Sequence, residues 1–190
     1  MIDLRRVSAC LITKDERYPA DVLEHVLCWP FGELLMLTNC DSPHRKQELF
    51  QKAKYDYLFY CDDDCLPPIQ ELVERSKPNI INCAMTEHHL QIYARSRIAL
   101  MGWGSIFPKK TIHVLDAYRE EYGEDHLYRR ETERIMTWFA FPQNRMDLPI
   151  IHTASAHAED RLSMQPDHYS YIPEVEQRCA AIEAKRLQTA

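Results

Sequence analysis

Residues 57–68 read YLFYCDDDCLPP, so a short apolar and aromatic run stops at three consecutive carboxylates and a proline pair. The run has the length and composition of a buried β-strand, and the prolines favour a turn into a helix. The aspartates should therefore lie at the carboxyl end of a central strand, where ligands bind in open α/β sheets. Three adjacent like charges repel unless a cation lies between them, and Mg²⁺ or Mn²⁺ suits that role. A solvated acidic turn is the alternative.

The bulk composition indicates one globular domain without membrane or secretory features. The chain has 190 residues, 45% of them hydrophobic, and no apolar run approaches the ~20 residues of a membrane helix. The N-terminus does not resemble a signal peptide, so we expect a cytoplasmic protein, or one made in a host cytoplasm. Seven cysteines at scattered spacings favour free thiols in a reducing compartment. Zinc binding by Cys61 and Cys65 with His88 and His89 is disfavoured by the aspartates between the two cysteines.

Charge and glycine content narrow the function classes. A net charge of −6 argues against a dedicated nucleic-acid binder, although it leaves room for a local basic patch. Only four glycines are present, and they do not form a phosphate-binding loop of the P-loop or Rossmann type. A nucleotide would therefore have to bind by another route.

The order of segments predicts an α/β fold with a mostly parallel, Rossmann-like central sheet flanked by helices. The first four expected strands cover residues 7–13, 33–38, 57–61 and 79–84. Two further strands, antiparallel or at the sheet edge, are expected at residues 91–94 and 98–107. The expected helices cover residues 19–28, 43–54, 69–75, 111–122, 125–139 and 173–187. An irregular C-terminal tail, rich in Pro and His, should begin at residue 141 and wrap the domain.

A family resemblance rests on the order and spacing of several segments. They are Thr13 with Arg17, NCDS at 39–42, CDDD at 61–64, MGWGSIF at 101–107, YGED at 122–125 and RETER at 130–134. Together they resemble a small bacterial or phage glycosyltransferase of the GT-A fold, over about residues 7–169. Members of that family move a sugar from a nucleotide-sugar donor through a metal ion held by a DxD-type motif. The resemblance implies a single domain over residues 1–190. Its nucleotide-binding half would cover about 1–84, its acceptor half about 85–170, and a C-terminal helix about 173–187.

The resemblance also implies roles for particular residues. The motif CDDD at 61–64 matches the DxD motif, so Asp62 and Asp64 would serve the metal, with Asp62 also near the nucleotide. Asp63 would accompany them at the nucleotide or cap the turn, and alternation along an extended segment would point Asp62 and Asp64 the same way. The other expected contacts to the nucleotide-sugar are Thr13, Arg17, Asn39, Asp41, Arg45, Gly102, Trp103 and Gly104. Plain surface charges and helix caps are the alternatives for the polar members of this set.

The expected catalytic base is a carboxylate that would take a proton from the acceptor hydroxyl. Glu133 is the first choice, Asp125 the second, and Glu131 the third, while most of the acids in this region should be solvated surface charges. The resemblance also implies a late metal ligand, supplied by a histidine of the tail. His152 is preferred over His157 and His168 because a short apolar run precedes it.

Two rival functions remain. A nucleotidyltransferase can share the fold and the acidic site, but the absence of glycine in residues 13–17 counts against it. A non-catalytic module on the same fold is the second rival. The acceptor is open between a saccharide, a small molecule and a hydroxymethylated pyrimidine in phage DNA. The last would use a basic rim of Lys109, Lys110, Arg129, Arg130 and Arg134.

Overall fold

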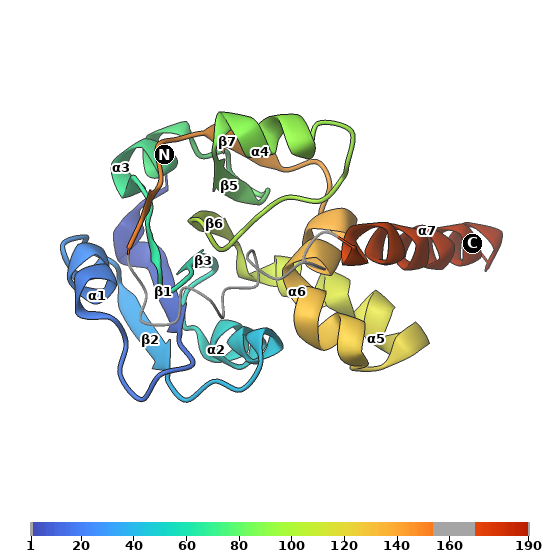
Figure 1. Ribbon diagram of the computed structural model, residues 1–190, viewed down its shortest axis with the longest axis horizontal. Coiled ribbons are helices and arrows are strands. Elements are labelled where there is room, and N and C mark those ends of the chain that lie inside the picture. The colour runs from blue at the N-terminus through green and yellow to red at the C-terminus, as the bar shows by residue number, and fades with distance from the viewer. Residues whose placement is uncertain (1, 154–169, 190) are drawn as a thin grey trace.

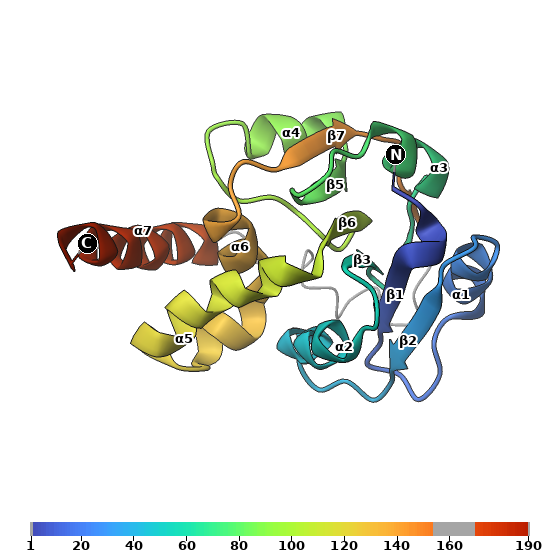
Figure 2. The same ribbon diagram turned by 180° about the vertical axis from the view of Figure 1, so that it is seen from behind.

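A six-stranded sheet forms the centre of the protein, with helices against both faces (Figures 1 and 2). The computed structural model describes residues 2–153 and 170–189. In spatial order the strands are β2 (Glu33–Leu37), β1 (Val7–Ile12), β3 (Tyr57–Cys61), β6 (Ser105–Pro108), β5 (Asn82–Met85) and β7 (Asn144–Asp147). β2 and β3 run parallel to β1, and β7 runs parallel to β5, while β6 is antiparallel to both its neighbours. The sheet is therefore mostly parallel, as the sequence predicts.

The helices and a small second sheet complete the chain. The α-helices are α1 (Ala20–Leu27), α2 (Lys46–Lys52), α3 (Ile69–Arg75), α4 (Glu87–Ile92), α5 (Asp116–Tyr122), α6 (His126–Phe139) and α7 (Tyr171–Thr189). Short 3₁₀ helices are η1 (Leu4–Arg6), η2 (Pro43–Arg45) and η3 (Lys109–Leu115). The second sheet pairs β4 (Cys65–Leu66) antiparallel with β8 (Ile151–His152). Within the described ranges, no helix combines the length and apolar character needed to cross a membrane.

β3 shows how the sequence builds the two-sided core. Successive side chains of a strand point to opposite faces. Leu58 and Tyr60 accordingly join the apolar cluster that includes residues of α2, α6 and α7. Phe59 and Cys61 join the other cluster, which includes residues of α1 and α3. Both clusters are buried, so β3 reads as a continuous apolar run and its end is anchored from both faces.

Two expected elements differ in the structure. Residues 91–94 are not a strand: helix α4 occupies Glu87–Ile92, with Thr86 before it as N-cap and Glu87 in its first turn. The expected strand over 98–107 is confined to Ser105–Pro108, and it lies between β3 and β5. The residues before it are irregular yet buried, so their apolar character reflects burial in the core rather than strand formation.

Smaller differences affect the other elements. The helix expected over 111–122 is a 3₁₀ segment, η3, followed by α5. β5 begins at Asn82 because Asn79, at the expected strand start, adopts a positive φ of 63°. The expected irregular tail contains β7 and β8. Part of that tail, residues 154–169, lies outside the described residues.

Candidate functional site

The acidic triplet lies at the carboxyl end of β3, between β1 and β6 in the sheet. Residues 63 and 64 form a turn that leads directly into β4. The Asp62 amide donates to the Gly102 carbonyl oxygen at 2.6 Å, and the Cys65 amide to the Asp62 carbonyl oxygen at 3.3 Å. The first bond fixes the turn to the glycine-containing segment that precedes β6, and the second closes the turn.

The three carboxylates have different partners because the backbone turns at this point. Asp62 accepts a hydrogen bond from the Tyr60 hydroxyl at 2.6 Å. Asp63 is hydrogen-bonded to the Thr13 side chain at the end of β1, and burial raises the pKa of its carboxyl. Asp64 accepts from the Cys65 thiol at 3.2 Å. The extended alternation expected for these residues does not continue past Cys61, and Asp63 is tied to the neighbouring strand.

Asp62 lies beside a buried lysine. The Nζ of Lys46, on α2, donates to the Tyr60 hydroxyl at 3.0 Å and forms an ion pair with Glu133 of α6. The Lys46 side chain is only 3% exposed, and its Nζ lies 4.5 Å from the Tyr60 ring centroid. Three elements therefore place Glu133, Lys46, Tyr60 and Asp62 in one connected polar chain under the acidic turn.

Burial dominates the electrostatics of Asp62. It raises the pKa of the Asp62 carboxyl to about 7, and the negative charge of Glu133 raises it further. The charge of Lys46 and the Tyr60 hydrogen bond act in the opposite direction. A carboxylate that holds a proton near neutral pH is one whose site has too little positive charge, so an added cation would be stabilised there.

The three expected catalytic residues lie in different settings. Asp125 is the N-cap of α6, accepts from the Tyr128 amide at 2.9 Å, and forms an ion pair with Arg178 at 2.5 Å. Glu131 is buried and paired with Arg130 and Arg134. Each of these two therefore has a structural role. Glu133 alone of the three joins the polar chain that reaches Asp62.

The expected nucleotide contacts cluster at the carboxyl ends of β1 and β2. The Thr13 amide donates to Leu37, and the Thr13 carbonyl oxygen accepts from Cys40 at 2.9 Å, which joins the two strand ends. Asn39, between them, adopts a positive φ of 53°, a conformation that asparagine tolerates. A nucleotide could reach this edge, since Asn39 is exposed.

The expected basic contacts differ in their surroundings. Arg17 is exposed. Arg45 is held by two carboxylates, Asp41 at 3.6 Å and Glu48 at 2.8 Å. A phosphate would have to compete with those carboxylates for the Arg45 guanidinium.

The two glycines of the GWG segment are required by packing. A Cβ on Gly102 would lie 2.0 Å from a carboxylate oxygen of Asp62. Gly104 has a φ of 113°, and a Cβ there would lie 2.5 Å from the Cβ of Pro67. Between them, the half-buried Trp103 lies edge-on to the His89 ring at 4.3 Å and to the His152 ring at 5.1 Å.

A group of possible metal ligands forms where β4 pairs with β8. Cys65 lies opposite His152 in this pairing, and the Thr153 amide donates to the Asp64 carbonyl oxygen at 2.8 Å. One ligand atom each from Asp64, Cys65 and His152 lies within 4.8 Å of the others. The remaining tail histidines, His157 and His168, lie outside the described residues.

No protein-family model matches this chain, and no curated protein matches it. The site must therefore be interpreted from its own geometry. That geometry adds Lys46 and Tyr60, which the sequence prediction missed, and His89, which it weighed only as a disfavoured zinc ligand. It brings Cys65 beside two of the expected metal ligands, Asp64 and His152, in a group that does not include Asp62. Only Cys65 carried a local signal, its position directly after the aspartates.

Proposed function

We propose that this protein is a metal-dependent glycosyltransferase that moves a sugar from a nucleotide-sugar donor, with a UDP-sugar favoured, to an acceptor hydroxyl. The observation that carries the proposal is the group formed by Asp64, Cys65 and His152 at the carboxyl end of β3, beside Asp62 and the GWG segment. The ends of β1 and β2 next to it supply an exposed edge for the nucleotide.

The donor atoms fit Mn²⁺ better than Mg²⁺. Asp64 offers a carboxylate oxygen, which both ions accept, but the imidazole of His152 suits transition metals. Burial raises the pKa of the Cys65 thiol, which donates to Asp64, so Cys65 would have to lose its proton to serve as a third ligand beside Asp64 and His152. When bound, the ion would stabilise the charge that develops on the leaving diphosphate.

Other residues of the chain would then orient the donor and receive the proton. Trp103 offers a flat apolar surface for a sugar, and Gly102 lets the backbone approach the Asp62 carboxylate closely. Glu133 is the candidate base, and its ion pair with Lys46 holds the carboxylate at the end of the polar chain. Asp125 and Glu131 are not proposed as bases, because neither joins the polar chain that reaches Asp62, and Asp125 also caps α6.

A DNA acceptor has lost part of its support. Of the basic rim, Arg134 is buried and paired with Glu131, and Lys109 donates to the Ala53 carbonyl oxygen at 2.6 Å. Arg130 also pairs with Glu131. A saccharide or small-molecule acceptor is therefore favoured over a modified base in phage DNA.

The test combines melting with a donor screen. Mn²⁺ with UDP should raise the melting temperature more than Mn²⁺ with ATP or CTP, because a ligand that binds only the folded state stabilises it. Hydrolysis of a panel of nucleotide-sugars with Mn²⁺ should then identify the donor. Asp64→Ala should abolish both effects.

Asp56→Ala is the matched control, since Asp56 is an exposed carboxylate at the opposite end of β3 and should leave both readouts unchanged. Mn²⁺ with ATP or CTP but not UDP would favour the nucleotidyltransferase. No melting shift with any nucleotide would leave the non-catalytic module.

A further inference from the structure

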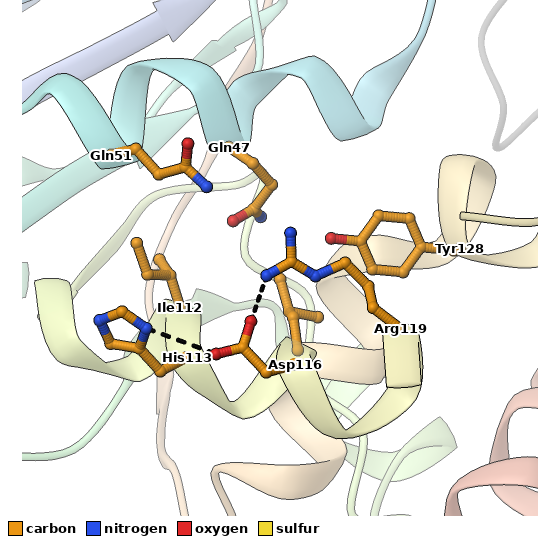
Figure 3. Close-up of a pocket in the computed structure, with 8 residues that line it drawn as sticks. Gln47, Gln51, Ile112, His113, Asp116, Arg119 and Tyr128 are labelled. Carbon is orange, nitrogen blue, oxygen red and sulfur yellow. Dashed lines mark hydrogen bonds and ion pairs between the residues drawn. The ribbon is translucent and has the colours of Figure 1, made fainter. Parts of the chain in front are cut away.

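A hollow of about 330 Å³ lies between α2 and the η3–α5 segment, and none of its lining residues belongs to the acidic turn or the possible metal ligands (Figure 3). α2, η3, α5 and α6 all contribute to its wall. The lining residues are Gln47, Gln51, Ile112, His113, Leu115, Asp116, Arg119 and Tyr128.

Gln47 is the residue of this hollow whose hydrogen-bonding capacity is left unused. Its side chain extends from α2 toward η3 and α5 (Figure 3), and the residue is only 9% exposed. Among the described residues, its buried Nε2 has no hydrogen-bond partner. A buried amide group without a partner is costly, so an acceptor atom placed in the hollow would be stabilised by this donor.

The charges on the wall cancel. Arg119 forms an ion pair with Asp116, and Asp116 also lies 3.5 Å from the ring of the exposed His113 (Figure 3). An anionic ligand would have to displace Asp116 from Arg119, and a cationic ligand would meet the guanidinium. The lining therefore favours a neutral ligand.

The remaining groups define the chemistry of that ligand. The two glutamine amides both donate and accept, Asp116 accepts, and the Tyr128 hydroxyl can do either. Ile112 and Leu115 add an apolar surface between these polar groups. Hydroxyl groups on a compact ring would match this mixture, since each can donate and accept while the ring carbons contact the apolar side chains.

We propose that this hollow binds a neutral, hydroxyl-rich ligand of about monosaccharide size. Its volume of about 330 Å³ is at the lower end of the range of about 300–1,000 Å³ that is usual for small-molecule pockets, which fits a ligand of that size. The site does not depend on the glycosyltransferase proposal, because its lining includes neither the aspartates at 62–64 nor the possible metal ligands Cys65 and His152.

The test is a titration of the ¹⁵N-labelled full chain, followed by heteronuclear NMR. The probes are D-glucose, D-galactose, D-mannose and N-acetyl-D-glucosamine, with sodium phosphate and sodium acetate as the anionic comparison. At least one sugar should give a saturable shift of the Gln47 side-chain NH₂ signals, while the anions should not. Gln47→Met keeps the length of the side chain but removes the donor, and should weaken sugar binding by about tenfold.

Gln70→Met is the matched control, because Gln70 is an exposed glutamine on α3 that bonds to Glu74 and not to the hollow. The proposal is overturned if no sugar shifts the Gln47 signals or if Gln47→Met binds as well as the natural chain. It is also overturned if the anions bind there more tightly than the sugars, or if the sugar shifts only the Trp103 indole signal at the acidic edge. Should Gln47→Met fail to fold, the shifts in the natural chain decide.

Discussion

Asp62 and Glu131 are both enclosed carboxylates, but the protein neutralises them differently. Glu131 in α6 contacts two guanidinium groups, those of Arg130 and Arg134. Asp62 at the end of β3 accepts from the Tyr60 hydroxyl, and Lys46 donates to that same hydroxyl. Within residues 2–153 and 170–189, no cation pairs directly with Asp62.

This difference separates a structural acidic group from a candidate functional one. At Glu131 the positive charge is supplied by the same helix, so the group is complete within the chain. At Asp62 the charge balance is incomplete, and burial raises the pKa of its carboxyl to about 7. An added cation would offset the repulsion between Asp62 and Glu133. At Glu131 two guanidinium groups already supply the positive charge.

The largest loss in the free energy of unfolding should follow from removing Glu131 from its cluster with Arg130 and Arg134. Glu131→Ala would leave the buried Arg134 without this carboxylate, and removing one partner of a buried ion pair destabilises a protein by about 3–5 kcal/mol. Urea unfolding of the variant measures the loss. Glu120→Ala, which removes an exposed pair with Arg186, should cost less than about 1 kcal/mol. Equal losses in the two variants would show that the Glu131 cluster is not special.

The next effect concerns pH and Asp62. Because its folded pKa of about 7 lies above the unfolded value, the stabilisation from the protonated carboxyl is complete below about pH 4 and is lost as pH rises through 7. The free energy of unfolding contributed by this group should therefore fall by about 2–4 kcal/mol over that range. Urea unfolding in EDTA at successive pH values measures it.

Asp62→Asn supplies the control for this pH dependence. The amide cannot ionise, so the variant should lack this fall in stability and should exceed the natural chain in stability above pH 7. Asp56→Asn, at an exposed carboxylate before β3, should keep the full pH dependence. The same change in stability from pH 5 to 8 in the natural chain and in Asp62→Asn would contradict the raised pKa.

The sequence was sufficient for the sheet and for β3 in particular. The predicted strand over residues 57–61 begins and ends at the same residues as β3. A strand that is buried on both faces leaves a continuous apolar run in the sequence. β7 was missed because its residues, Asn144–Asp147, are mostly polar and only partly buried, as an edge strand allows. The strand predicted over residues 91–94 was wrong because Ile92 and Tyr93, which favour strands by composition, lie at the end of helix α4.

The site was less accessible to sequence reasoning because its parts come from distant segments. Lys46 and Glu133 are 87 residues apart, and a lysine on a short helix gives no local sign that it is buried. The position of Cys65 beside His152 depends on the β4–β8 pairing, which joins two strands of two residues each. Strands that short leave no periodic pattern to detect.

The smallest effect separates a structural from a catalytic role at Asp125. Asp125→Ala removes an N-cap and an ion pair with Arg178 that is only partly buried, so it should cost about 1–2 kcal/mol in urea unfolding. Asp125→Asn should recover part of this loss because asparagine also caps helices. The proposed sugar transfer, measured with the donor that the hydrolysis screen identifies, should stay near that of the natural chain in the folded Asp125→Ala variant, whereas loss of the catalytic base would lower it by about 10²–10⁴-fold. A loss of that size in Asp125→Ala, with Glu133→Gln still active, would move the base from the polar chain at Asp62 to the start of α6.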